Sequence, residues 1–394
     1  MDADIHTLAV DVMGSDCGPA EVLQGVVEAL GDREDFRAVL VGDRDIIEKT
    51  LASHRSFPSE RLEICHASEV IGMDEKPVHS LRTKKDASMV RAIELLHEGR
   101  VQAMLSCGNT GSLIAGSTLK LHTMPGIERP ALATVVPTMN RYIVMADVGA
   151  NPNTTPLQLV HNAILAGDYY TKVLQIPNPK IGLLTIGTEE GKGNEVTLAA
   201  HELLKQLDDL ISYHGLIEGF QILTGEVDVV ICDGFVGNVL LKTMESFVVQ
   251  IKSYFREEFK KNIVRMLSAV LARGVLASLR GRLNPETYGA ASLLGLKGAV
   301  LKSHGSSNHR SIRSAIKMAV SMTGHNAAQS CEERIRLANE RIKSLDHPES
   351  PSEPESSTKT LVEAAQIVNG KTFGVDRHAR GPNFRVNWES QACK

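Results

Sequence analysis

The sequence predicts an α/β protein, a Rossmann-like sandwich in which helices cover both faces of a mixed, mostly parallel sheet. Short apolar runs rich in β-branched residues recur along the chain, and most of them are followed by a helix-like segment. Strands that are apolar almost throughout are typical of sheets buried on both faces. With 394 residues, 42% of them hydrophobic, the chain is long enough to bury a core of this size.

Eight runs are predicted to form strands, and helical patterns lie between them. The runs are LAVDVMG, RAVLVGD, AMLSCG, ATVVP, YIVMADVG, IGLLTIG, VDVVICDG and GAVLKSHG. The helical patterns are Glu21 to Leu30, Ser88 to Glu98, Gly111 to Leu121, Pro156 to Leu174, Glu195 to Leu207 and Gly237 to Val249. Most runs end in Gly, Asp or Ser, so the loops that follow are expected at the carboxyl edge of the sheet. Open α/β folds bind their ligands at that edge.

Two segments differ from this pattern. Residues 251–282 contain eight Lys or Arg against two Glu, with apolar residues at helical spacing. They are predicted to form a basic amphipathic helical hairpin that bends near Gly274 and protrudes from the sheet domain.

The α/β domain is predicted to span residues 1–344. Residues 345–394, which include PESPSEPESSTKT, are predicted to be a disordered tail.

Composition narrows the classes of partner and compartment. The net charge of −4 provides no global basic field for nucleic acid, so no nucleic-acid partner is expected. The six cysteines are scattered without a C-x-x-C pair, which favours free thiols and no metal site. The first residues lack the pattern of a signal peptide, and no stretch has the roughly 20 apolar residues of a membrane span. We therefore expect a cytoplasmic protein that needs no cofactor.

Two glycine-bearing turns are candidates for binding an anion. In SCGNTGS, residues Gly108, Asn109, Thr110 and Gly111 lie between a predicted strand and a helix, where free amide groups and the helix dipole attract phosphate. A tight turn without a ligand explains the same spacing. The second turn, GTEEGKGNE, carries Lys192 and Asn194. It departs from a nucleotide-binding P-loop because its glycine spacing is one residue short and Gly193 replaces the Ser or Thr.

Further polar residues follow other predicted strands. These candidates are Asp11, Asp147, Asn151, Asp233, Asn238 and His304. Asp and Asn are also common turn formers and helix caps, so a single such residue indicates little. Their joint position at strand ends is what favours a site, because acyl transfer needs anion donors and an acid or base in one crevice. Cys107 has no histidine partner in the sequence and is interpreted as a buried small residue.

Over residues 6 to 340 the chain resembles the bacterial phosphate acyltransferase family, PlsX. The likeness rests on AVDVMGSD, KKDASMVRAIELLHEG, SCGNTGS, GIERPALA, DVGANP, IGTEEGKGNE, CDGFVGNVLLK, YGAASLLGLKG and KSHGSSN, in this order. The chain departs from the family at Cys107 and Ser112, where Ala is usual, and at Ala290 and Ser292, where Gly and Pro are commoner. The resemblance implies a fold like those of isocitrate and isopropylmalate dehydrogenases.

The resemblance also implies a homodimer that transfers a fatty acyl group from acyl carrier protein to inorganic phosphate. The acyl phosphate would pass to a membrane glycerol-3-phosphate acyltransferase. The composition of the basic hairpin fits a dimerisation hairpin that buries Leu and Val against its twin, a surface that binds anionic lipid or the carrier protein, or both. We expect Lys192 and the 108–111 turn to share one phosphate ion, with Asp233 or His304 orienting Lys192 or moving a proton. Three alternatives remain: a coenzyme A-dependent phosphotransacylase, a metal-dependent hydroxyacid dehydrogenase, and a non-catalytic scaffold at the membrane.

Overall fold

The structure is a computed structural model that describes residues 5–54, 57–138, 141–189, 191–282, 289–323 and 327–346. Contacts within the chain divide it after residue 347, and the first unit contains all of the described residues. Of the predicted tail at 345–394, only 345 and 346 are described, and they end a helix. The rest of that prediction lies outside the described residues.

The described residues form one sheet of eleven strands in the order β3-β2-β1-β4-β11-β10-β5-β6-β9-β7-β8. It is mixed and mostly parallel, as the sequence predicts. The strands are β1 (His6–Asp11), β2 (Phe36–Gly42), β3 (Leu62–His66), β4 (Ala103–Ser106), β5 (Ala131–Pro137), β6 (Tyr142–Ala146), β7 (Lys180–Leu184), β8 (Ser212–Ile217), β9 (Val229–Ile231), β10 (Ala290–Leu294) and β11 (Ala299–Ser303).

Strand direction reverses in the middle of the sheet. β10 is antiparallel to both β11 and β5, and β5 is antiparallel to β6. The strands β3, β2, β1, β4 and β11 therefore end at one edge, called here the first edge. The strands β6, β9, β7 and β8 run the opposite way and end at the second edge. Loops that follow strands consequently lie at two opposite edges.

Helices cover both faces of the sheet, and each layer buries its own core. One face packs against α1 (Pro19–Asp32), α2 (Arg44–Leu51), α6 (Pro156–Leu174), α7 (Glu195–Lys205), α11 (His309–Met322) and α12 (Ala327–Asp346). The other packs against α3 (Pro77–Thr83), α4 (Ser88–His97), α5 (Thr110–Leu121) and the first part of α8 (Gly234–Lys260). Apolar side chains on both sides of the central strands explain their continuous hydrophobic runs.

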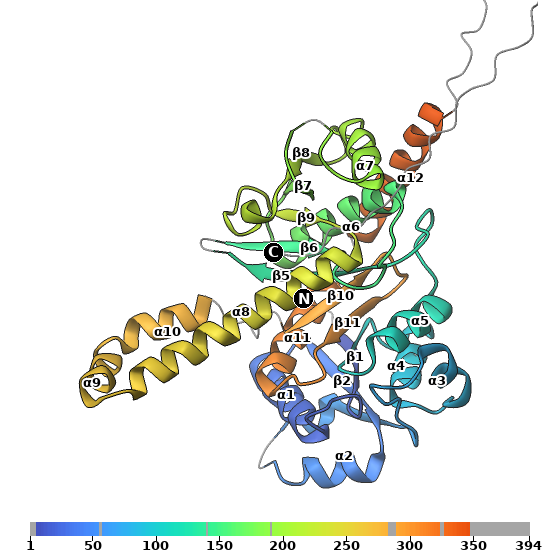
Figure 1. The fold of residues 1–394 in the computed structure, drawn as a ribbon. Coiled ribbons are helices and arrows are strands. Elements are labelled where there is room, and N and C mark those ends of the chain that lie inside the picture. The colour runs from blue at the N-terminus through green and yellow to red at the C-terminus, as the bar shows by residue number, and fades with distance from the viewer. Residues whose placement is uncertain are drawn as a thin grey trace, which may run out of the picture. The chain divides into compact units, whose positions relative to one another are not determined.

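The basic segment protrudes as predicted, although it has an additional break. Figure 1 shows α8 leaving the sheet, with α9 (Ile263–Leu271) at the far end and α10 (Arg273–Arg282) running back. The first break lies at residues 261–262, where the Asn262 side chain accepts a hydrogen bond from the Arg265 N–H at 2.9 Å and caps α9. The second break lies at Ala272, between α9 and α10, and Gly274 is the second residue of α10, so the predicted bend near Gly274 agrees with the structure. The break after α8 was not predicted.

All eight predicted runs form strands, and three further strands were not predicted. β3 and β8 lie at the two ends of the sheet, where their side chains are partly exposed and the apolar run is interrupted. β10 reads AASLL and lacks the β-branched residues that mark the other strands. Because β10 was missed, the sequence did not indicate the antiparallel strand that lies between β11 and β5.

Candidate active site

The turn between β4 and α5 is held rigidly by its own polar residues. The Ser106 hydroxyl donates to the buried carboxylate of Asp11 at 2.6 Å and accepts from the Gly108 N–H at 3.0 Å. The Asn109 side chain caps α5 by accepting from the Ser112 N–H, and its amide donates to the Met73 carbonyl at 2.7 Å. Asn109 and the Gly108 amide are thus already engaged. The first amide groups of α5, on Thr110 and Gly111, have no partner within the helix.

Cys107 lies in the same turn and is fully buried. Burial raises the pKa of its thiol to about 12. At neutral pH a thiol of this kind is almost entirely protonated, and only the thiolate is a good nucleophile. The structure therefore agrees with the interpretation of Cys107 as a small core residue.

At the second edge, Asp147 and Asn151 organise the loop after β6. The Asp147 carboxylate is completely buried and accepts hydrogen bonds from the main-chain N–H groups of Leu132, Gly149, Ala150 and Asn151. The Asn151 amide donates to the Pro130 carbonyl at 2.7 Å and to Asp147 at 3.0 Å. Burial raises the pKa of Asp147, while these hydrogen bonds oppose the rise. Both side chains are engaged within the protein.

Two other predicted site residues are helix caps. The Asp233 carboxylate accepts from the Val236 N–H at 2.8 Å at the start of α8, and Asn194 accepts from the Thr197 N–H at 2.8 Å at the start of α7. Their position after a strand reflects the need of each helix for an N-terminal acceptor. The cap explains these residues without a ligand.

The structure does not bring Lys192 and the 108–111 turn together. Lys192 is exposed in the turn after β7, at the second edge, whereas the 108–111 turn follows β4 at the first edge. β4 and β7 are six strands apart in the sheet. At a spacing of about 4.8 Å between neighbouring strands, this corresponds to about 29 Å across the sheet. The topology therefore does not support the expectation that both turns share one phosphate ion, because strand direction reverses between β5 and β6.

Helix α8 connects the two edges and lines a hollow. Five residues in its first half line a hollow of about 450 Å³: Asn238, Val239, Lys242, Thr243 and Ser246. The Asn238 side chain packs on the loop after β6. Its Cγ lies 3.6 Å from the position that a Cβ at residue 149 would occupy. Lys242, one turn further along, is close enough to His304 and Lys302 for its charge to lower their pKa values. The α8 crevice is the name used here for Asn238 and Lys242, which line this hollow, together with His304, which lies within range of the Lys242 charge.

Within the α8 crevice, His304 follows β11 and is exposed. Its Nδ1 lies 2.8 Å from the Ser306 hydroxyl. Partial desolvation of the ring by its neighbours lowers its pKa, Lys242 and Lys302 lower it further, and Glu245 and Asp16 oppose them. Lys242 was not predicted as a site residue, although it ends the CDGFVGNVLLK string. Its spacing of four residues from Asn238 on a helix was the available signal.

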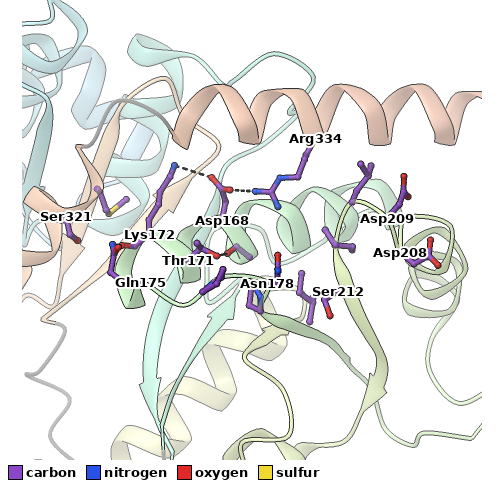
Figure 2. Close-up of a pocket in the computed structure, with 17 residues that line it drawn as sticks. Asp168, Thr171, Lys172, Gln175, Asn178, Asp208, Asp209, Ser212, Ser321 and Arg334 are labelled. Atoms are coloured by element: carbon purple, nitrogen blue, oxygen red, sulfur yellow. Dashed lines mark hydrogen bonds and ion pairs between the residues drawn. The ribbon is translucent and has the colours of Figure 1, made fainter.

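A second cavity lies elsewhere. It measures about 1030 Å³ and is bordered by α6, the segments leading into β7 and β8, and parts of α11 and α12 (Figure 2). In it Asp168 pairs with Lys172 at 3.2 Å and with Arg334, which ties α12 to α6. None of the predicted site residues lines this cavity. We interpret its charged residues as the contacts that dock α12.

No helix in the described part of the chain is long and apolar enough to cross a membrane. The fold itself is shared with enzymes that exchange acyl groups. It is similar to a phosphotransacetylase from Streptococcus pyogenes, with a TM-score of 0.55 and 17% identity over 81% of this chain and 94% of that one. At this identity the likeness shows the fold alone.

Sequence comparison identifies the family. The model of the Fatty acid synthesis protein family matches residues 6–330. A phosphate acyltransferase of Halothermothrix orenii is 39% identical over 84% of this chain and 99% of its own length. One of Thermoanaerobacterium thermosaccharolyticum is 40% identical over 85% of this chain and 98% of its own. The protein is thus an acyltransferase. It belongs to the Fatty acid synthesis protein family, of which these phosphate acyltransferases are relatives.

Proposed function

We propose that the protein transfers a fatty acyl group from acyl-acyl carrier protein to inorganic phosphate and supplies acyl phosphate for phospholipid synthesis. The names of the relatives and of the family support an acyl donor and a phosphate acceptor. The observation that carries the proposal is that Asn238 and Lys242 line one hollow and that the charge of Lys242 acts on His304. A cation, an amide and an imidazole in one crevice provide what phosphate binding and proton transfer need.

The reaction needs little activation of its nucleophile, because phosphate is already anionic at neutral pH. In our proposal Lys242 and Asn238 hold phosphate while one of its oxygens attacks the thioester carbonyl. The free amide groups of Thr110 and Gly111 stabilise the oxyanion; such a donor typically contributes about 3 to 4 kcal/mol. The C–O bond forms and the C–S bond breaks, while His304 accepts the proton of the attacking phosphate and passes it to the departing thiolate.

Lys192 keeps a separate role in this proposal. Its turn follows β7, which pairs with β9, and α8 begins just after β9. The turn is therefore a neighbour of the start of α8 on the second edge, although it lies far from the 108–111 turn. We propose that Lys192 attracts the anionic substrate from that side of the α8 crevice.

The donor distinguishes this proposal from a coenzyme A-dependent phosphotransacylase. Purified protein is incubated with phosphate and either palmitoyl-acyl carrier protein or palmitoyl-coenzyme A, and acyl phosphate is trapped with hydroxylamine. We expect a hydroxamate from the carrier-protein thioester at a kcat/KM at least tenfold higher. Equal or better use of the coenzyme A thioester would contradict the proposed donor. Absence of product from both would leave the scaffold alternative.

The protruding α8–α10 segment supports two partner proposals. Its side chains include many exposed large apolar residues, among them Phe247, Phe255, Ile263, Leu267 and Leu271, at 47–83% exposure. Apolar surface of this extent is typical of an interaction site. We propose that part of it is buried in a homodimer and that the basic residues around it hold the protein peripherally on an anionic inner membrane face, near a membrane glycerol-3-phosphate acyltransferase.

A further inference from the structure

Lys302 occupies an unusual position for a lysine. β11 lies in the interior of the sheet, between β4 and β10, and Lys302 pairs with Ser106 of β4. Its neighbours Val300 and Leu301 are completely buried, and Lys302 itself is only 9% exposed. An interior strand position of this kind normally holds an apolar side chain, because burying a charge without a partner is unfavourable.

The ammonium group of Lys302 has only main-chain acceptors in the described part of the chain. It donates to the Cys107 carbonyl at 3.2 Å and to the carbonyl of Ser303. No ion pair with a carboxylate is found for it among the described residues. The charged and titratable groups around it are Cys107, Asp11 and Asp16 from the first edge and Lys242 from α8. Burial lowers the pKa of Lys302, and Lys242 lowers it further.

Lys302 is thus linked both to the turn before α5 and to His304 of the α8 crevice. Lys302 donates a hydrogen bond to the Cys107 carbonyl in the turn before α5. The hydrogen bond between Ser106 and Asp11 holds the same turn from the other side. That turn leads directly into the free amide groups of α5. The charge of Lys302 also acts on His304, which faces Lys242 and Glu245 of α8 and Asp16.

We infer that Lys302 is a positioning residue of the α8 crevice: its buried ammonium group fixes the turn that opens α5 and adds positive potential beside His304. The inference rests on the proposed function only for the identity of the substrates. It explains why a cation is retained at an interior position of the sheet, where its desolvation is otherwise unfavourable. Phosphate and the oxyanion are negative, so a fixed positive charge near them stabilises both.

The test compares Lys302→Met and Lys302→Gln with Lys297→Met in the full chain. Methionine removes the charge and the donor, and glutamine removes the charge but keeps an N–H donor. Lys297 is exposed in the turn between β10 and β11 and serves as a matched control. Three quantities are measured: the pKa of His304 by NMR, hydrogen exchange of the 107–111 amides, and kcat and KM for phosphate. The first two need no acyl donor.

We expect both Lys302 variants to raise the pKa of His304, because a cation that lowers it is removed. Lys302→Met also speeds exchange of the 107–111 amides and lowers kcat/KM for phosphate on the order of 100-fold, the loss that a displacement of about 1 Å causes in an active site. The 107–111 amides exchange more slowly in Lys302→Gln than in Lys302→Met, because glutamine keeps an N–H donor. Lys297→Met leaves all three quantities unchanged.

Folded Lys302 variants with unchanged His304 pKa and amide exchange would overturn the inference. Failure of both variants to fold would also overturn it, because Lys302 would then serve the stability of the sheet. If wild-type protein makes no acyl phosphate from either donor, the proposed function fails while the NMR and exchange results still decide the role of Lys302.

Discussion

Gly237 packs directly against the main chain of Asp147: a Cβ at position 237 would overlap the carbonyl oxygen of Asp147 and crowd the Cys232 sulfur. The start of α8 is thereby seated on the end of β6. Asn238 is the next residue along the helix, so the same close contact determines where its amide lies. The position of the α8 crevice thus depends on residue 237 having no side chain.

Gly237→Ala is expected to destabilise the protein although alanine favours helices. Overpacking of this kind costs about 1 to 3 kcal/mol. Gly274→Ala in α10 is the matched control, because no atom lies within 4 Å of a Cβ built there. We expect Gly274→Ala to stabilise by up to about 1 kcal/mol. Urea unfolding of both variants measures the difference, and equal free energies of unfolding would contradict the packing argument.

Lys242→Ala is expected to weaken phosphate use more than Lys192→Ala does. Loss of a charge-assisted hydrogen bond costs about 1.5 to 3 kcal/mol, which corresponds to a roughly 10- to 100-fold lower kcat/KM for phosphate. Initial rates of acyl phosphate formation at varied phosphate concentration give kcat/KM for each variant. Lys297→Ala, at an exposed position, is the control. Near-normal kinetics of Lys242→Ala together with a large loss in Lys192→Ala would move the phosphate site to the β7 turn.

The stability of the protein is expected to fall below pH 6.5 because of His161. This residue of α6 is 1% exposed, and its Nε2 lies 2.8 Å from Oδ1 of Asn339 in α12. Burial lowers its pKa, whereas the bond to Asn339 and the charge of Glu128 oppose this. A histidine pKa below its unfolded value of about 6.5 disfavours protonation of the folded state. The contribution of neutral His161 to the free energy of unfolding is therefore complete above pH 6.5 and is lost as the pH falls below that value.

His161→Gln tests this dependence. The free energy of unfolding is measured in urea at pH 8, 7, 6 and 5. We expect the wild type to lose stability more steeply below pH 6.5 than the variant does, with a difference in slope of at most about 1.4 kcal/mol per pH unit for one group. Identical slopes would mean that His161 accepts a proton equally well in the folded protein.

Charge reversal on the protruding segment is expected to reduce membrane binding. Arg256 and Arg273 are exposed on α8 and α10. Each basic residue near an anionic surface contributes about 1 kcal/mol. In sedimentation with vesicles containing phosphatidylglycerol, Arg256→Glu/Arg273→Glu should bind at least tenfold more weakly, and salt should weaken the wild type. Arg310→Glu on α11 is the control, and equal binding by both variants would argue against contact through this segment.

The sequence was sufficient for the class of fold because buried strands leave continuous apolar runs, as in YIVMADVG before Asp147. It was less informative about the site. Asp233, Asn194 and Asn109 lie after strands and look like ligand-binding residues, yet a helix cap requires the same residue types at the same place. Which strand ends meet depends on strand direction. That direction reverses between β5 and β6, and an apolar run does not indicate which way its strand points. Lys242 was overlooked because a lysine inside a helix looks like a solvated residue until its neighbours are known.

The length of α8 has a practical consequence. Its 27 residues span about 40 Å at about 1.5 Å per residue, so the tip formed by α9 is remote from Asn238 and Lys242 near its base. A fluorophore or tether attached at Leu271, which is 83% exposed, would report docking at the tip without obstructing substrate entry. Attachment to a surface and turnover could therefore be monitored in a single preparation.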